Sequence, residues 1–151
     1  MLKKLILLFF ITINLTNCGY TPMHSNVTDA NFSITELEIE GNNQINNLIR
    51  TRLEKYLNTN ADKKYELKII TSSDKTAVAK DSTGKTTHLK ISTNLNLNII
   101  KENQNKIISF SESLTIKKDE NNYEQSNYER IVIENMTETL FNKMIFYLSK
   151  D

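Results

Sequence analysis

Few residues of this chain could carry out chemistry, and they do not form a catalytic arrangement. The 151 residues include one cysteine, Cys18, and two histidines, His24 and His88. Nucleophilic catalysis needs a Ser or Cys beside a basic His that a third group orients. His24 lies near the only proline, and His88 begins a strand on its polar face, so neither is placed beside a nucleophile. No phosphate-binding glycine loop or His-x-x-His pair occurs, so we expect no enzyme and no metal.

Cys18 does have the surroundings of one specific reaction, the attachment of lipid to a secreted protein. Lys3 and Lys4 precede an apolar run over residues 5–13. This run is shorter than the about 20 residues that span a bilayer, and it suits a signal-peptide core of about 7–15 residues. Leu15-Thr16-Asn17-Cys18 then resembles the bacterial lipobox, whose cysteine thiol is alkylated by diacylglycerol. We predict a lipoprotein signal peptide over residues 1–17 and no cofactor beyond diacylglycerol and an N-acyl chain on Cys18. An ordinary signal peptide with an incidental cysteine is the alternative.

The charge balance favours an acyl anchor and excludes nucleic acid as a partner. The whole chain has 19 Lys+Arg and 18 Asp+Glu, and loss of residues 1–17 leaves 134 residues with a net charge of −1. Binding to nucleic acid needs a clear basic excess. Gly19 follows the cysteine, whereas Asp at that position favours retention in the inner membrane. We therefore expect the periplasmic face of the outer membrane, with an extended lipidated tether over 18–31 and a single domain over 32–151.

Hydrophobic patterns in this domain predict four strands and two helices. Alternating apolar and polar residues place strands at 32–40, 64–71 (weakly continuing through Val78), 88–101 and 107–117. A change of phase within the first strand predicts a bulge or an edge strand. Apolar residues every three to four positions place helices at 43–58 and 126–149, the first capped by Asn42 or Asn43 and the second by a Ser126–Glu129 capping box. The polar segment 72–87 is predicted to be a long hairpin tip.

Together these elements predict an α+β fold in the order β-α-β-β-β-α. Each helix has one apolar stripe and the sheet has one apolar face. The simplest burial is therefore a two-layer sandwich, with both helices packed on one face of a four-stranded, mainly antiparallel sheet. Glu112 is a carboxylate in an otherwise apolar phase of its strand, and we expect it to end the buried region or to pair with a lysine.

The surface left over is polar and weakly charged. Ser, Thr and Asn on the outward sheet face offer hydrogen bonds at less desolvation cost than ions, although such a face can also simply contact water. Near the hairpin, lysine side chains could ligate phosphate as point charges. They are Lys75, Lys80, Lys85 and Lys90. Asp74 and Asp81 offset two of these charges, so a solvated charged loop is the alternative.

The combination of motif and element order resembles the LptE family of lipopolysaccharide-assembly lipoproteins. The mature chain would begin Cys18-Gly19-Tyr20-Thr21-Pro22-Met23, where family members often have Cys-Gly-Phe/Tyr-x-Pro-Leu. The stretch Tyr123-Glu124-Gln125-Ser126-Asn127-Tyr128 is similar to the family's entry into its last helix. The resemblance covers nearly the whole mature chain, mostly as a pattern of elements.

This resemblance implies a role without catalysis. Such proteins act as a plug inside the large outer-membrane β-barrel LptD, help it to fold, and help to deliver lipopolysaccharide to the outer leaflet. It also implies contact with lipopolysaccharide phosphates through basic residues near the strand tips, for which Lys75, Lys80, Lys85 and Lys90 are the candidates by position. The alternatives are a periplasm-facing lipoprotein that binds another soluble or cell-wall partner, and a small lipid-anchored hydrolase.

Overall fold

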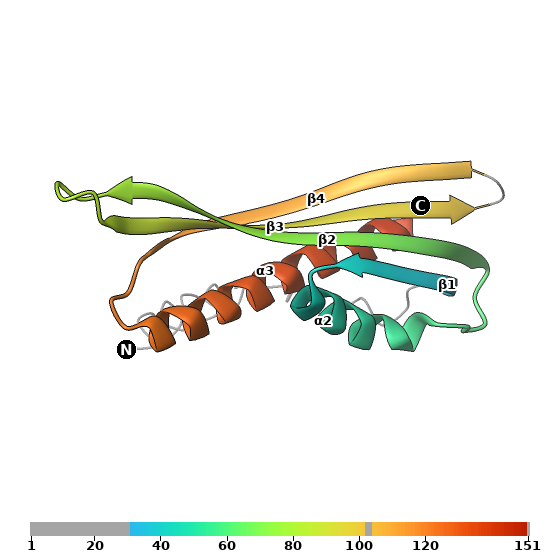
Figure 1. The fold of residues 1–151 in the computed structure, drawn as a ribbon. Coiled ribbons are helices and arrows are strands. Elements are labelled where there is room, and N and C mark those ends of the chain that lie inside the picture. Colours follow the sequence, from blue (N-terminus) through green and yellow to red (C-terminus); the bar gives the residue numbers. More distant parts are fainter. Residues whose placement is uncertain (1–30, 102–103, 151) are drawn as a thin grey trace, which may run out of the picture.

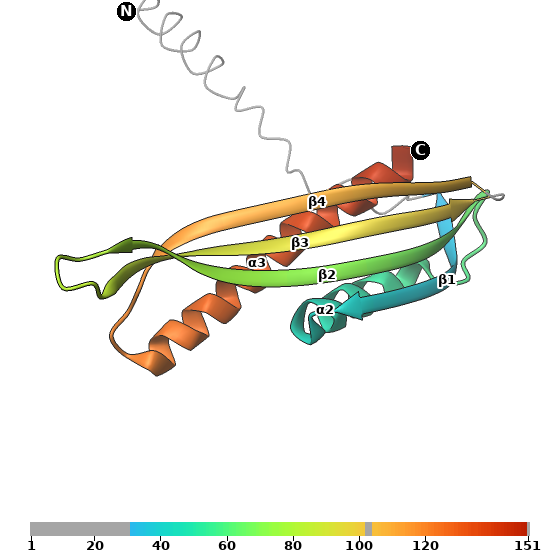
Figure 2. The same cartoon turned by 45° about the horizontal axis from the view of Figure 1, so that its top comes forward.

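The computed structural model describes residues 31–101 and 104–150, whose elements follow the predicted order. They are β1 (Phe32–Gly41), α2 (Asn43–Leu53), the 3-10 helix η1 (Glu54–Tyr56), β2 (Lys63–Lys80), β3 (Thr86–Lys101), β4 (Gln104–Lys117) and α3 (Asn122–Lys150). Both helices lie on one face of the sheet (Figures 1 and 2), which confirms the α+β sandwich. The predicted signal peptide, Cys18 and the tether up to residue 30 lie outside the described residues.

The sheet has the strand order β1-β2-β3-β4 and mixed polarity. β1 pairs parallel to β2, and the other two pairs are antiparallel. A parallel neighbour needs a crossover connection, which α2 and η1 provide. The register of β1 shifts between Ile34 and Glu36, so the change of phase in the sequence marks a bulge in an edge strand, as predicted.

The segment 72–87 is not a long tip, and this prediction was wrong. β2 continues to Lys80, β3 begins at Thr86, and only residues 81–85 form the turn. Pairs such as Asp74 with Ser92 continue the ladder through this stretch. Pairing satisfies the backbone hydrogen bonds whatever the side chains are, so a hairpin can extend where polar side chains on both faces hide the period of two.

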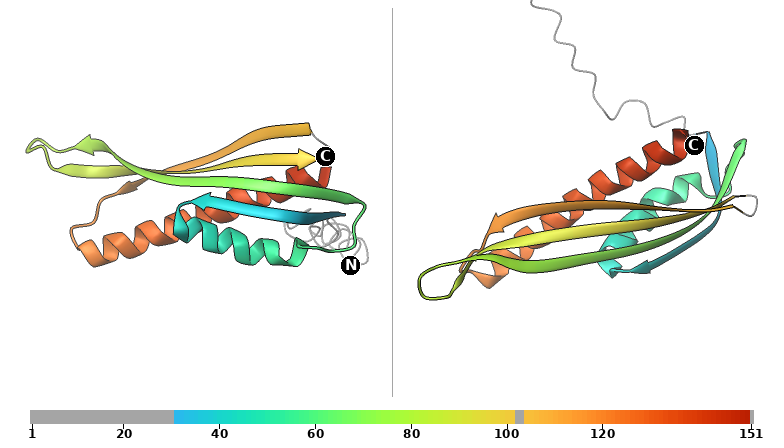
Figure 3. Two further views of the ribbon diagram at one scale, coloured as in Figure 1. Left: turned by 45° about the vertical axis from the view of Figure 1, so that its right-hand side comes forward. Right: turned by 90° about the horizontal axis from the view of Figure 1, so that it is seen from above.

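The N-terminus of α3 also differs from the prediction, because Ser126 does not cap it. The helix begins at Asn122, and Asn121 Oδ1 accepts from the backbone N–H of Tyr123 at 3.0 Å and of Glu124 at 3.4 Å. Ser126 therefore lies inside the helix. The 29 residues of α3 extend about 44 Å. The helix runs obliquely across the face of the sheet (Figure 3) and packs on β3 and β4.

The shorter helix α2 is capped by Asn42, one of the two residues predicted for this role. Asn42 Oδ1 accepts from the N–H of Ile45 at 3.2 Å. The α-helix ends at Leu53, and the predicted last turn becomes the 3-10 helix η1 followed by Leu57, which bridges to Ile34. Just before α2, Gly41 has φ +107°, and a Cβ there would lie 1.9 Å from the carbonyl oxygen of Thr71. Only glycine fits this approach of β1 to β2.

Two clusters form the core between sheet and helices. The larger one joins β1, β2, β3, α2, η1 and the second half of α3, and its fully buried members include Ile34, Leu53, Tyr65, Leu97 and Met144. The smaller cluster lies under the hairpin half of the sheet and consists of Ile91, Ile116, Val132 and Met136. The core thus extends toward the hairpin on the helix side only, and the opposite face of the sheet stays outside it.

Candidate functional site

The face of the sheet opposite the helices, called here the outer sheet face, is polar in its central part, where Asp74 is charged. Toward β1 it carries the ion pairs of Lys68 with Glu38 and Glu40, and toward the hairpin it carries Lys90. Residues of β2, β3 and β4 meet there in register; Asn94, for example, lies between Ser72 and Ser111. Asn94 Nδ2 donates to Ser72 Oγ at 3.2 Å. The central part of this face consists of Ser72, Asp74, Thr76, Ser92, Asn94, Asn96, Asn98, Ser109, Ser111, Ser113 and Thr115. Its hydroxyl and amide groups can donate or accept as a partner requires.

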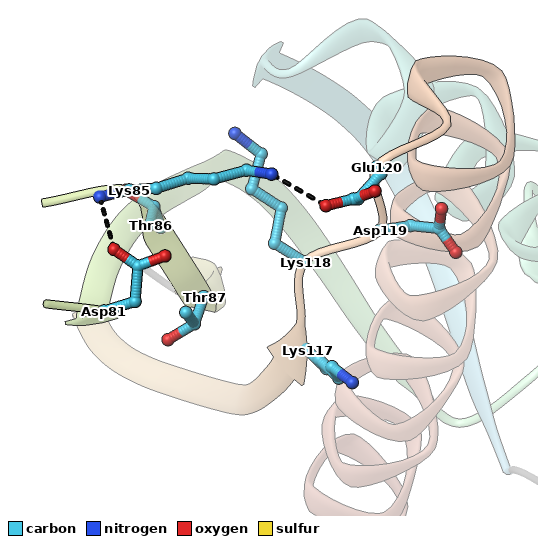
Figure 4. Close-up of a pocket in the computed structure, with 8 residues that line it drawn as sticks. All are labelled: Asp81, Lys85, Thr86, Thr87, Lys117, Lys118, Asp119 and Glu120. Atoms are coloured by element: carbon cyan, nitrogen blue, oxygen red, sulfur yellow. Dashed lines mark hydrogen bonds and ion pairs between the residues drawn. The ribbon is translucent and has the colours of Figure 1, made fainter. Parts of the chain in front are cut away.

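A cavity of about 430 Å³ lies at the hairpin end, between the β2–β3 turn and the loop from β4 to α3 (Figure 4). It is lined by Asp81, Lys85, Thr86, Thr87, Lys117, Lys118, Asp119 and Glu120. We call it the tip cavity. Three lysines face three carboxylates in this lining, so the cavity has no net positive charge.

Ion pairing and turn geometry fix the charged groups of the tip cavity. Lys85 Nζ lies 2.7 Å from Glu120 Oε1, which lowers the pKa of Glu120 and raises that of Lys85. Asp81 Oδ1 accepts from the hydroxyl of Thr83 at 2.6 Å and from its N–H at 2.9 Å. These bonds hold the pKa of Asp81 below its usual range, the hydroxyl having the largest effect. The turn is therefore closed by a carboxylate that stays ionised.

The structure separates the four lysines that the sequence grouped as phosphate ligands. Lys85 lines the tip cavity but is paired, and Lys80, at the end of β2, is exposed. Lys90 is exposed on the outer sheet face, opposite Thr76 and Thr115. Lys75 points to the helix face instead, where its Nζ lies 2.6 Å from Glu129 Oε2. The four side chains do not converge on one anion site.

Glu129 is the centre of a buried polar network that the sequence analysis missed. Its Oε1 accepts from Gln125 Nε2 at 2.7 Å, while Gln125 Oε1 accepts from the N–H of Asp119 at 2.6 Å. Burial acts to raise the pKa of Glu129, but the hydrogen bonds from Lys75 and Gln125 outweigh it and the pKa is lowered. The network ties β2 to the first turns of α3 and to the loop before it. The sequence analysis missed this role of Glu129 because it assigned Glu129 to the capping box that begins at Ser126.

The sequence analysis also missed Lys117 and Lys118, which line the tip cavity. The signal was present as two adjacent lysines where the last strand ends, because Lys117 is its last residue and Lys118 follows it. In an antiparallel meander the end of the last strand returns to the turn of the preceding hairpin, and Lys118 N–H donates to Thr87 O at 2.8 Å. Glu112, in contrast, behaves as expected, because it pairs with Lys143 of α3.

Metal ligands do not gather in residues 31–101 and 104–150. No group of three or more His, Cys, Asp or Glu could hold a metal ion among them. No helix in this part of the chain has the length and apolar character to cross a membrane. His88 Nδ1 lies 3.1 Å from the hydroxyl of Thr87, a residue that lines the tip cavity.

Comparison with known proteins identifies the fold. No model of a known protein family matches the sequence, and no curated protein matches it. Rare lipoprotein B from Shewanella oneidensis, in its crystal structure, has a TM-score of 0.60 at 11% identity over 77% of this chain and 95% of that chain. The chain has the fold of solved lipoproteins. A putative lipoprotein from Caulobacter crescentus CB15 (TM-score 0.51, 11% identity, 76% and 88% covered) and lipoprotein B from Nitrosomonas europaea (TM-score 0.51, 10% identity, 77% and 83% covered) share it.

Proposed function

We propose that this protein is an outer-membrane lipoprotein of the LptE type, not an enzyme, and that it acts as plug and assembly partner of an LptD-like β-barrel in lipopolysaccharide transport. Acyl chains on Cys18 hold it at the periplasmic face of the outer membrane. The similarity of fold to lipoproteins over about three-quarters of the chain supports this proposal.

The outer sheet face carries the proposal. The lumen of a large outer-membrane barrel is lined by polar side chains. A protein seated there needs hydrogen-bonding groups across its surface and few charges, because desolvating ions without partners is costly. The row Ser72–Asn94–Ser111 has this character, and the next row, Asp74–Ser92–Ser113, adds one carboxylate. A lipoprotein that works alone in the periplasm would have no need of a central band of hydroxyl and amide groups in register.

The tip cavity and the lysines near it provide a second, weaker element of the function. We propose that Lys80 and Lys90, which are exposed, meet lipopolysaccharide phosphates, and that Lys85 does so only by exchanging its bond to Glu120. Lys75 has a structural role in this account, because Glu129 holds it on the helix side.

Introducing charge on the outer sheet face tests the barrel partnership. Asn96 and Ser109 are exposed, face each other across β3 and β4 and belong to neither core cluster, so Asn96→Glu with Ser109→Glu changes no core contact. We expect this pair to abolish co-purification with the barrel, because two carboxylates would be desolvated in the lumen. The matched control is Asn47→Glu with Thr51→Glu on the exposed side of α2. Equal barrel recovery with the outer-face pair and with unaltered protein would refute the proposed contact and favour a different partner.

Lipid attachment is tested separately by metabolic labelling with palmitate. The unaltered chain is expected to incorporate the label and a Cys18→Ser variant to lose it. Unchanged labelling of Cys18→Ser would end the lipobox hypothesis and leave an ordinary signal peptide.

A further inference from the structure

The two edges of the sheet differ in how they are protected against pairing with another strand. β1 forms one edge and β4 the other (Figure 3, right). β1 is bent by its bulge and carries exposed carboxylates at alternate positions, Glu36, Glu38 and Glu40. Bulges and charges of this kind discourage a further strand. β4 has no register shift along its pairing with β3, and among residues 31–101 and 104–150 no strand pairs with its other side.

The backbone groups of β4 that face away from β3 belong to the serines of its middle part. Lys118 N–H donates to Thr87 O at 2.8 Å, and the register of β3 and β4, continued by one step, places these two residues directly opposite each other. Bonded and unbonded positions alternate along an antiparallel pair. The even-numbered residues of β4 therefore bond to β3, and the N–H and C=O groups of Ser109, Ser111 and Ser113 point to the free edge.

An apolar groove of about 300 Å³ lies beside this edge, between β4 and α3. Residues of β4 and α3 alone line it, so it opens at the free edge and not toward β3. Three large apolar side chains of its lining are exposed, Leu114 by 46%, Tyr128 by 49% and Ile131 by 38%. Exposed apolar groups that cluster on a polar protein indicate a contact surface.

The charges along β4 leave its middle part open to a partner. Glu112 lies on the helix face of the strand, where an isolated carboxylate would oppose pairing. Its Oε1 is bonded to Lys143 Nζ of α3, so a neighbouring strand would meet a neutral pair. Lys106 and Lys117 lie near the two ends of β4 and limit pairing to the residues between them.

The proposed plug role determines which occupant this edge requires. Backbone N–H and C=O groups that leave water need new hydrogen-bond partners, and an extended segment supplies them by adding a strand to the sheet. Ser109, Ser111 and Ser113 also carry hydroxyls of the outer sheet face, so one partner can contact that face and the edge without interruption. The wall strands of a closed barrel are paired on both sides, so the segment is one that leaves the wall and enters the lumen.

We propose that β4 takes up an extended segment of the barrel partner as a fifth strand of the sheet. On its helix side this segment carries an apolar side chain that enters the groove beside Leu114, Tyr128 and Ile131, and on its other side it carries polar side chains. The proposal deepens the plug role and rests on it.

Amide hydrogen exchange of the unaltered full chain, alone and in the complex purified from envelopes, tests the pairing residue by residue. In the free chain the amides of Ser109, Ser111 and Ser113 should exchange fast, whereas the even-numbered residues between them should be protected by β3. In the complex we expect the three serine amides to slow by on the order of 100-fold. The loop 59–61, on the β1 side of the fold, is the internal reference and should slow far less.

A proline on the edge tests the same contact by recovery of the barrel. Ser111→Pro removes an outward N–H and places a ring in the path of a fifth strand, while β4 keeps its bonds to β3. Ser111→Ala is the matched control, because it removes the hydroxyl and keeps the N–H. We expect the proline to lower recovery of the barrel about tenfold and the alanine to leave it unchanged, with both free variants folded by circular dichroism.

The groove is tested by Leu114→Ser, which should also lower recovery of the barrel. Val78→Ser is its matched control, because Val78 has a similar exposure of 48% and does not line the groove. Equal recovery with the two serine variants would contradict entry of an apolar side chain at Leu114.

A complex in which the three serine amides exchange as fast as in the free chain would overturn the fifth strand and leave the plug role standing. Slowing that is equally large in the loop 59–61 would be general shielding and would overturn the pairing as well. Protection of these amides in the free chain that grows with its concentration would assign the edge to a second copy instead. Recovery of the chain without any barrel would overturn the plug role and the fifth strand together.

Discussion

Replacement of Glu129 tests how the first turns of α3 are held to the sheet. Glu129 accepts from Lys75 of β2 at 2.6 Å and from Gln125 of its own helix at 2.7 Å. Its side chain is 11% exposed, whereas that of Lys75 is 53% exposed. Glu129→Gln keeps an oxygen that can accept from Gln125 but removes the charge that Lys75 meets. Glu129→Leu removes both bonds.

The unequal exposure of the partners sets the expected magnitudes. Lys75 can return to water, so Glu129→Gln should lower the free energy of unfolding by about 1 kcal/mol, below the about 1.5–3 kcal/mol of a charged hydrogen bond. Glu129→Leu also leaves the buried amide of Gln125 without its acceptor, which adds about 1–3 kcal/mol. We therefore expect a total loss of about 2–4 kcal/mol for Glu129→Leu.

The assay is urea unfolding followed by far-ultraviolet circular dichroism at several pH values. The folded pKa of Glu129 lies below its ordinary value. Its stabilisation is therefore complete above the unfolded pKa of about 4.3 and is lost as pH falls through the folded pKa. The difference between unaltered protein and Glu129→Gln should be full at pH 7 and should shrink steadily in acid.

Glu120→Gln is the matched control, because Glu120 also accepts from a lysine but its side chain is 86% exposed. Its unfolding midpoint should stay unchanged. If Glu129→Gln left stability at pH 7 unaltered, or if its effect were the same in acid, the role assigned to the Lys75 pair would be wrong.

Two further pairs of substitutions test the backbone of the fold. Gly41→Ala should cost roughly 2–4 kcal/mol in urea unfolding, because its Cβ would meet the carbonyl oxygen of Thr71, while Gly84→Ala, with φ +84° and nothing within 4 Å, should cost about 1 kcal/mol. Comparable losses at the two glycines would contradict the close approach of β1 and β2. Asn121→Ala should lose about 1 kcal/mol of stability as a helix cap, and Ser126→Ala should lose much less. The reverse ranking would restore the capping box that the sequence suggested.

The strands with one buried face were predictable from the sequence, and the extension of the hairpin was not. In β3, every second side chain from Leu89 to Ile99 packs toward the helices. These positions are therefore mostly apolar and alternate with polar ones, which is the pattern that predicts a strand. The second half of β2 carries Asp74 outward and Lys75 inward, so neither face is apolar and the period vanishes. There the ladder with β3 determines the strand, and that pairing is not local in sequence.

The tip cavity was only partly predictable for a related reason. Lys85 was expected near the hairpin, but the contribution of Lys117 and Lys118 depends on the register that places His88 opposite Lys117. Strand lengths, and therefore the residues that reach the tip, follow from the whole sheet. The misplaced start of α3 had a local cause: Asn121 and Ser126 both suit a cap, and the short loop after β4 selects the earlier one.

The composition of the complex in the membrane tests the central claim most directly. The full chain with an affinity tag is purified from detergent-solubilised envelopes of its native cells, and its mass and partners are measured. The proposed function predicts an equimolar complex with a large outer-membrane β-barrel, whose recovery falls with the outer-face variant Asn96→Glu with Ser109→Glu. Recovery of a lone lipidated monomer, or of a soluble partner in place of a barrel, would contradict it.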